Sequence, residues 1–246
     1  MKNKLIFVLI FLVSVVTLRF LAFKYLHGMD FSPIIVAIAF LLIQRDKFSS
    51  FNFKLFNPLS LIIILIISYL MWFLMIIIQS YFNLSEFSAA SINTILKWTI
   101  IALIIGFSEE LAWRGYLFSK LKDLTWFQIT IIINLIWAIW HIPSHFHTLE
   151  GSLWISYPLF IISCFELGII MQYLRVKTDS VIPCILFHAF FIIPAMMFTM
   201  KSKVLYLGSF PSIIMLLLLM PITVYCYRVG QRIHENKTSV QKNIEI

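Results

Sequence analysis

Apolar runs about as long as a membrane is thick recur along the whole chain, and they constrain the fold more than any other feature. A helix needs about 20 apolar residues to cross the hydrocarbon core of a bilayer. Eight stretches approach that length, at residues 5–26, 31–43, 58–82, 92–118, 126–143, 153–174, 181–200 and 206–227. The 246 residues are 61% hydrophobic and 12% charged, which is too apolar for one soluble core. We therefore predict an all-α, polytopic membrane helix bundle of about eight transmembrane helices, with residues 1–246 forming a single domain.

The charged residues are grouped between the apolar runs. The net charge of +8 does not gather on one polar face of the kind that binds nucleic acid. Most Lys and Arg instead lie in residues 1–4, 44–57, 119–125, 175–180 and 228–246. Because cytoplasmic loops retain positive charge, this distribution predicts a multi-pass cell-membrane protein with both termini in the cytoplasm. Membrane lipids are then its immediate partners, and no nucleic acid is expected.

The first apolar run, the polar C-terminal residues and the cysteines carry no candidate for chemistry. Residues 5–16 resemble the core of a signal peptide, but bulky residues follow where a cleavage site would lie, so we expect an uncleaved first span. The polar composition of residues 234–246 predicts a flexible cytoplasmic tail. Cys164, Cys184 and Cys226 lie inside apolar runs, at no spacing typical of metal or redox sites, and are expected to be apolar fillers.

Two adjacent glutamates inside the fourth run are the first candidates for chemistry. Placing an ionisable side chain in the hydrocarbon core costs several kcal/mol, so such a residue is expected to have a function. Glu109 and Glu110 repel each other and burial disfavours their charged forms, so one of them can accept a proton near neutral pH. Arg114 follows Glu110 by one helical turn and can pair with it. Glu109 points about 100° around the helix and is left as the freer carboxylate. A purely structural Glu–Arg pair would need only one of the two glutamates.

Histidines in two later runs are the next candidates. His141 lies deep in the fifth run, and His188 lies in the seventh, where its polar partner has to come from another helix. His145 follows His141 by four residues, which is the spacing of helical zinc ligands, although Pro143 lies between them. A lone histidine at such a depth serves equally well as a hydrogen-bonding link between helices.

Two further polar residues lie inside apolar runs. Glu166 can pair with a polar group across the bundle, line a water-filled cavity or take part in the chemistry. Asn134 lies one turn before Trp137 and is expected to form a hydrogen bond between helices.

The order of these motifs resembles the family of CAAX proteases and bacteriocin-processing enzymes, also called CPBP, Abi or type II CAAX prenyl endopeptidases. The resemblance covers about residues 92–200 and rests on an EExxxR motif at Glu109, an aromatic-xxxH motif ending at His141, and the later His188. It implies an intramembrane endopeptidase that hydrolyses a membrane-embedded or lipidated peptide. It also implies that Glu109 activates water and that His141 and His188 complete the site, with Glu110 and Arg114 belonging to the same motif.

The chain departs from the pattern of that family at two positions. Trp137 stands where the family has phenylalanine, which keeps an aromatic ring. Ile192 stands where the family has Asn or Asp, and it cannot supply the side-chain donor expected to stabilise an oxyanion. Asn134 or a backbone N–H is left as an alternative donor, so the departure bears on activity more than on fold.

Cofactor use and function each leave alternatives open. Glu109, His141 and His188 are the candidate ligands if zinc takes part. We favour a metal-free mechanism with a glutamate base, because the different surroundings expected for Glu109 and Glu110 already make one carboxylate a better proton acceptor than the other. A non-catalytic bacteriocin-immunity or partner-binding membrane protein is one alternative function. A proton- or cation-coupled transporter using Glu109, Glu110 and Glu166 is another, although the repeats that many transporters contain are absent from the sequence.

Overall fold

Helices form at each of the eight predicted positions. The computed structural model describes residues 2–25, 31–46, 51–54, 56–82, 85–143, 153–202 and 210–244. Its main helices are α1 (Lys2–Tyr25), α2 (Ser32–Ile43), α3 (Leu59–Tyr81), α4 (Ile92–Glu110), α6 (Trp126–Trp140), α8 (Leu153–Thr178), α9 (Ile182–Met197) and α10 (Phe210–Ile244). After α4 the helix continues through a π-helical segment, η2 (Leu111–Leu117), into the short α5 (Phe118–Leu121). The prediction of a helical membrane bundle is confirmed.

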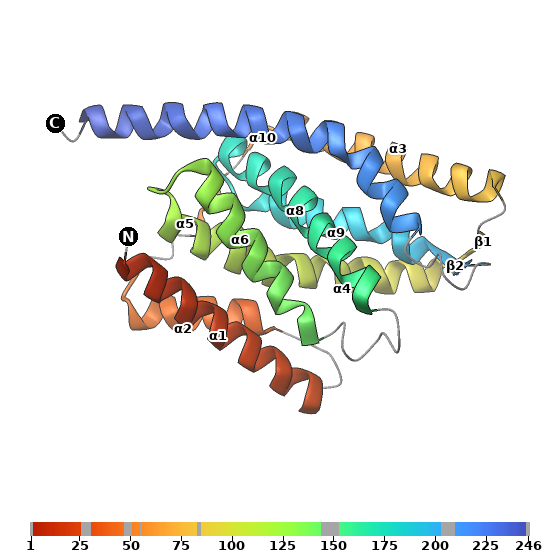
Figure 1. The fold of residues 1–246 in the computed structure, drawn as a ribbon, viewed down its shortest axis with the longest axis horizontal. Helices are drawn as coiled ribbons and strands as arrows, with labels where there is room; N and C mark the ends of the chain where they lie inside the picture. The colour runs from red at the N-terminus through yellow and green to blue at the C-terminus, as the bar shows by residue number, and fades with distance from the viewer. Residues whose placement is uncertain are drawn as a thin grey trace.

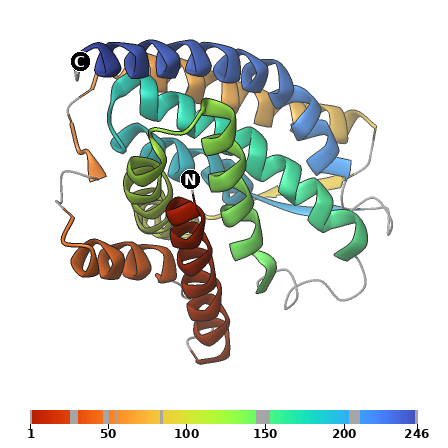
Figure 2. The same cartoon turned by 60° about the vertical axis from the view of Figure 1, so that its left-hand side comes forward.

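The helices pack around a central group formed by α4, α6, α8 and α9. Helix α10 runs along one side of this group, against α8 and α3 (Figure 1). Helix α4 packs against α9, and α6 packs against α8. Helices α1 and α2 lie at the opposite edge of the bundle, where α2 contacts η2 and α1 contacts α6 (Figure 2). The segment that carries Glu109 and Glu110 is therefore enclosed from several sides.

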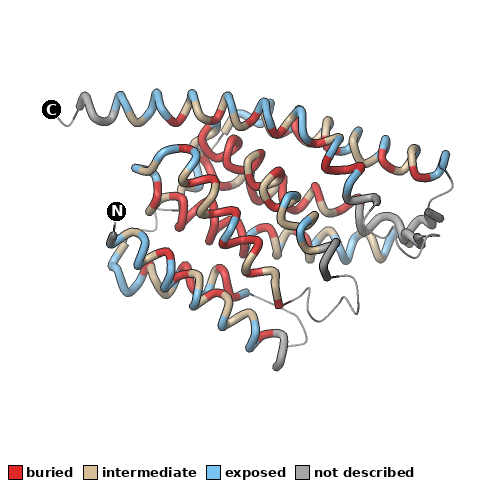
Figure 3. Tube along the Cα trace, viewed as in Figure 1, coloured by how far each residue is buried: buried red, intermediate tan, exposed pale blue. Residues whose placement is uncertain are grey.

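Burial is concentrated in this central group. Figure 3 shows buried backbone along α6, α8 and α9, whereas α1, α3 and α10 show many exposed positions. Many of those exposed positions carry large apolar side chains, such as Leu70, Phe73 and Leu217, which are 58%, 63% and 62% exposed. Exposing so many large apolar side chains to water is unfavourable, but lipid solvates them. The chain is a membrane protein whose outer helices face lipid.

The described helices differ in how far they can cross a bilayer. Four are long and apolar enough to span it, at Asn3–Ala22, Leu59–Tyr81, Tyr157–Thr178 and Ile213–Val240. Helices α2, α6 and α9 have 12, 15 and 16 residues. At 1.5 Å per residue these helices are about 18–24 Å long, which is shorter than a hydrocarbon core of about 30 Å. The apolar runs of the sequence are longer than these helices because the run from 126 passes the helix end at Trp140, and the run from 181 continues into a strand.

A short β-ribbon joins the segments after α3 and α9. Strand β1 (Ser85–Ala89) pairs antiparallel with β2 (Phe198–Ser202), with Phe87 opposite Met200. The sequence predicts helices only, because residues 198–200 continue an apolar run. The ribbon connects the start of α4 to the end of α9, two helices that also pack along their length.

The end of the chain also differs from expectation. We predicted a flexible tail over residues 234–246, but α10 continues as a helix to Ile244. His234 is buried and its Nε2–H donates to the carbonyl of Leu124 at 2.9 Å. One turn later, Lys237 Nζ donates to the carbonyl of Val176 at 2.7 Å. These contacts with two other parts of the bundle hold polar residues in the helix.

The start of α6 fixes which of its residues face the centre of the bundle. Thr125 caps the helix, since its side chain accepts from the backbone N–H of Gln128 and the Gln128 side chain accepts from the N–H of Thr125. From this start, Asn134, Trp137 and His141 follow at spacings of three and four residues, and therefore share one face. That face meets the end of α4.

Candidate functional site

Glu110, the last residue of α4, is completely buried and connects two helices. Its Oε1 accepts a hydrogen bond from Arg114 Nη1 at 3.1 Å, within the same helical segment. The same oxygen lies 2.8 Å from Nδ1 of His188 on α9. With a proton on Nδ1, His188 donates to the carboxylate, and its Nε2 remains for other contacts. The predicted Glu110–Arg114 pair is confirmed, and the predicted partner of His188 on another helix is Glu110.

Glu109 is bound separately from its neighbour. Its Oε2 accepts a hydrogen bond of 2.7 Å from the indole Nε1–H of Trp137 on α6. The side chain is nearly buried, at 5% exposure. The two glutamates therefore have different partners on different helices, as their divergence around the helix predicts. Glu110 contacts Arg114 and His188, whereas Glu109 accepts from the neutral indole of Trp137.

Arg114 lies in the π-helical segment η2 and is fully buried. Its Nη2 donates to Asn134 Oδ1 at 3.1 Å, so the predicted interhelical role of Asn134 is confirmed. Its guanidinium also lies over the Trp137 ring, 5.1 Å from the ring centre. A buried ion pair requires such additional contacts to offset the loss of water around both charges. A π-helical segment has wider turns than an α-helix and often occurs at functional sites.

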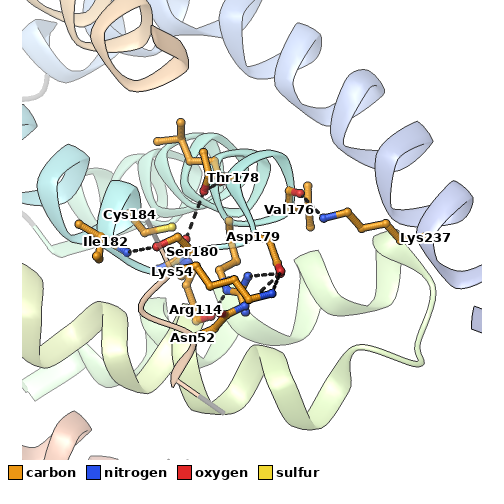
Figure 4. Close-up of polar contacts among 12 residues, drawn as sticks. Asn52, Lys54, Arg114, Val176, Thr178, Asp179, Ser180, Ile182, Cys184 and Lys237 are labelled. Atoms are coloured by element: carbon orange, nitrogen blue, oxygen red, sulfur yellow. Dashed lines mark hydrogen bonds and ion pairs between the residues drawn. The ribbon is translucent and has the colours of Figure 1, made fainter. Parts of the chain in front are cut away.

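A polar cluster at the turn between α8 and α9 supports this segment from the other side. Arg175 Nε donates to the carbonyl of Arg114 at 3.0 Å, and its Nη1 pairs with Asp179 at 3.2 Å. Asp179 also accepts from Asn52 at 3.0 Å and from Lys54, as Figure 4 shows. Burial alone would raise the pKa of Asp179, but the hydrogen bond from Lys54 and the charge of Arg175 outweigh it and hold this pKa below its usual value.

A cavity of about 140 Å³ lies beside the two histidines, between α6, α8 and α9. Trp137, His141 and His188 line it together with apolar side chains that include Ile192. A water molecule occupies about 30 Å³ in the liquid, so the space suits a few waters or one medium-sized side chain. Glu109 is not among the described residues that line the cavity, but Trp137 binds Glu109 and forms part of the cavity wall.

His141 ends α6 and has a different environment from His188. Its Nδ1 lies 2.9 Å from the carbonyl of Trp137, one turn earlier in the same helix. Its ring contacts the rings of Trp140 and Phe160, with centres 4.6 and 4.9 Å apart. The structure thus brings His141, His188, Glu109, Glu110 and Arg114 around one aromatic residue, Trp137.

Two glycines allow the backbones to approach closely enough for these contacts. A Cβ at Gly106, one turn before Glu110, would lie 2.8 Å from the carbonyl oxygen of Ile185 on α9. A Cβ at Gly168 on α8 would lie 1.9 Å from Asn134 Oδ1, the atom that accepts from Arg114. No side chain larger than hydrogen fits at either position without moving its neighbour. The site therefore depends on backbone packing as well as on its polar residues.

The remaining candidates lie apart from this group. Glu166 on α8 is 6% exposed, and its Oε2 has no hydrogen-bond partner among the described residues. It is also absent from the described cavity lining. His145 lies outside the described residues. Within the described ranges, no three His, Cys, Asp or Glu side chains cluster closely enough to hold a metal ion, so Glu109, His141 and His188 do not form a zinc-ligand set in this arrangement.

Sequence reasoning missed two of the polar contacts. Arg175 was expected only as a loop cation, because it ends an apolar run next to other positive charges. The indole of Trp137 was treated only as an aromatic ring, although it also carries an N–H donor. A donor-bearing aromatic residue four positions before a histidine in an apolar run was the available signal. Asn134 was an alternative donor to the oxyanion; its Oδ1 accepts from Arg114, its Nδ2 has no partner among the described residues, and it is absent from the described cavity lining.

Comparisons with known proteins match the part of the chain that contains these residues. The family model described as type II CAAX prenyl endopeptidase Rce1-like matches residues 91–193, which include the five candidate residues. The curated protein CAAX prenyl protease 2 of Methanococcus maripaludis is 28% identical over 153 residues. That match covers 56% of this chain and 56% of the relative, so the chain spans little more than half of the relative's length.

Proposed function

We propose, from the match of residues 91–193 to the Rce1-like family model of type II CAAX prenyl endopeptidases, that the chain is an intramembrane endopeptidase. One observation carries the proposal. Inside a membrane-embedded bundle, two buried glutamates have separate partners, Trp137 and His188, and both partners line a cavity that His141 also lines. Peptide hydrolysis needs a base for water and a stabiliser for the oxyanion, and this group of residues can supply both.

Glu109 is the base in the proposed mechanism. Its carboxylate takes a proton from a water molecule, and the resulting hydroxide attacks the scissile carbonyl carbon. The proton then passes from Glu109 to the leaving nitrogen as the C–N bond breaks, which returns Glu109 to its starting state. The hydrogen bond from Trp137 to Glu109 Oε2 supports this role, because it holds one carboxylate oxygen in place and leaves Oε1 for water. A positioned base contributes about 10²–10⁴-fold to such a reaction.

His188 stabilises the oxyanion that forms when hydroxide attacks. A proton on Nδ1 is directed to Glu110 Oε1, so a second proton on Nε2 makes the ring an imidazolium paired with a buried carboxylate. Its Nε2–H then donates to the oxyanion, where one preorganised donor contributes about 3–4 kcal/mol. Ile192, on the same cavity wall, has no such donor, so stabilisation of the oxyanion depends more on His188. His141 positions the attacking water from the other side of the cavity.

The substrate class follows from the surroundings of the site. The cavity is small, its wall is mostly apolar and it lies within the bundle, so a scissile bond reaches it from the membrane, as in a substrate that is membrane-embedded or carries a lipid. The matched relative is named a CAAX prenyl protease. A peptide with a prenylated cysteine near its C-terminus is therefore the first substrate to test.

The test uses purified protein in lipid vesicles and a fluorescence-quenched peptide that ends in a farnesylated CAAX sequence. We expect cleavage by the wild type and a loss of about 10²-fold or more in Glu109→Gln. Glu166→Gln is the matched control, since it makes the same change at another buried glutamate away from the cavity, and it should keep its rate. Equal cleavage by wild type and Glu109→Gln would contradict the role of Glu109. Cleavage of an unprenylated version at the same rate would contradict the lipidated substrate.

The proposed mechanism uses no metal ion, and metal analysis tests this directly. Purified wild type should contain no stoichiometric zinc, and strong chelators should leave its rate unchanged. His188→Ala and Glu109→Gln are the comparators. One zinc per chain in the wild type that is lost in His188→Ala would overturn the metal-free mechanism.

A further inference from the structure

Trp137 contacts four of the five ionisable side chains in the described site. Only Glu110 lies outside its contacts. Its indole N–H binds Glu109, and the Arg114 guanidinium lies over its ring. The rings of His188 and His141 meet it edge-on, with centres 5.6 and 5.7 Å away. The side chain is only 4% exposed, so water does not compete for these contacts.

The hydrogen bond to Glu109 is the part of these contacts that only tryptophan can make. A phenylalanine at the same position would keep a ring beside Arg114 and the histidines but would have no donor. Within the described residues, the indole is the single hydrogen-bond partner of Glu109, and it binds Oε2. A nearly buried carboxylate that lost this donor would be free to rotate and would have one oxygen without a partner.

The bond also determines which oxygen of Glu109 can react. An indole N–H can donate but cannot accept a proton, so it does not compete with Glu109 as a base. Because Oε2 is occupied by this donor, Oε1 is the oxygen available to a water molecule. Trp137 also forms part of the cavity wall, so the same residue fixes the carboxylate and borders the space that admits water.

We propose that Trp137 is a positioning residue for Glu109, whose indole N–H holds Oε2 and presents Oε1 to the reacting water. This inference rests on the endopeptidase activity proposed above. It predicts that removing the N–H lowers kcat without changing KM, because substrate binding does not involve this bond. A loss of about 10- to 100-fold in kcat is expected for one buried hydrogen bond to a charged group.

Trp137→Phe removes the donor and keeps an aromatic ring. Trp140→Phe is the matched control, since Trp140 lies one turn later in α6, is 1% exposed, and donates its indole N–H to Ser32 Oγ at 2.9 Å. Both variants lose one buried indole hydrogen bond, but only the first loses a bond to Glu109. The control keeps a ring against His141 and should keep kcat within about twofold, since its lost bond goes to Ser32 and not to Glu109. If Trp137→Phe fails to fold, benzothienylalanine at position 137 keeps the shape of the ring and replaces the N–H by sulfur.

An NMR measurement tests the contact independently of activity. Protein labelled with ¹⁵N-tryptophan in lipid nanodiscs gives one indole signal for each of its seven tryptophans, and the signal missing from Trp137→Phe identifies Trp137. Glu109→Gln should shift that signal more than any other indole signal. If Glu109→Gln leaves the Trp137 signal unshifted, the contact is absent and the inference is overturned. If the signal shifts but Trp137→Phe keeps the wild-type kcat, the contact exists but does not position the base, and the inference is also overturned. A wild type that cleaves no peptide, with the signal shifted as expected, identifies the proposed function itself as the part that is wrong.

Discussion

At the scale of single residues, the site depends on how buried charges are compensated. Arg114 is enclosed completely, yet its guanidinium pairs with Glu110, donates to Asn134 and lies over Trp137. Removing one member of a buried ion pair costs more than the pair contributes, because the other charge is left without a partner. Glu110 would then be held by His188 alone.

The variant Arg114→Met keeps most of the side-chain volume and removes the charge. We expect it to lower the free energy of unfolding by about 3–5 kcal/mol, measured by thermal or denaturant unfolding in detergent. Arg232→Met on the exposed side of α10 is the control, and should change stability by no more than about 0.5 kcal/mol. Equal stabilities of the two variants would mean that the buried pair does not compensate Arg114 as described.

Asp179 gives a pH-dependent prediction at the same scale. Its pKa in the folded protein lies below the usual value, so its stabilising effect is complete above about pH 4 and is lost as the pH falls further. Asp179→Asn should therefore be less stable than the wild type at pH 7, and the difference should narrow as the pH drops below 4. Asp123→Asn is the control, because Asp123 pairs with Lys4 but is 68% exposed. A constant difference between wild type and Asp179→Asn over this range would contradict the shifted pKa.

At the scale of elements, the position of Glu110 against His188 depends on the close packing of α4 and α9. Gly106 precedes Glu110 by one turn, and its place next to Ile185 keeps the two backbones in contact. The π-helical η2 follows directly and carries Arg114 and Gly115. The geometry of the site is therefore set by backbone features on both sides of the glutamates.

Gly106→Ala should push α4 away from α9, because a backbone carbonyl cannot move aside as a side chain can. We expect it to destabilise the protein by about 1–3 kcal/mol and to reduce peptide cleavage. Gly115→Ala is the control, since its Cβ would lie 3.0 Å from a side-chain atom of Phe51 and not within 3 Å of a backbone carbonyl. If Gly106→Ala is as active and as stable as Gly115→Ala, the packing of α4 on α9 does not set the site.

Local spacing could predict some of these features and not others. The pairing of Glu110 with Arg114 follows from residues one turn apart, and the eight helices follow from apolar runs. The bond from His188 to Glu110 joins residues 78 positions apart, so it depends on how α9 packs on α4. The same holds for Trp137, and the helical end of α10 depends on contacts with Leu124 and Val176 that a polar composition does not reveal.

At the scale of the whole molecule, the distribution of charge predicts the orientation in the membrane. If all eight apolar runs cross, the grouping of most Lys and Arg in alternate loops predicts that both termini and the Asp179 cluster lie on the cytoplasmic side. A membrane-impermeant thiol reagent added to intact cells should then fail to label Gln44→Cys, and should label it after the cells are opened. Lys203→Cys is the control and should react in intact cells. Labelling of Gln44→Cys from outside would contradict this topology and require a different number of crossings.

The central claim is that Glu109 gives this membrane bundle its peptide-cleaving activity. The most direct test compares the membrane peptides and protein termini of cells that produce wild type or Glu109→Gln at equal levels, identified by mass spectrometry. We predict at least one new terminus, on a membrane-embedded or lipidated protein, that is present with the wild type and absent with Glu109→Gln. Identical sets of termini at equal protein levels would contradict the claim and favour a role in binding a partner.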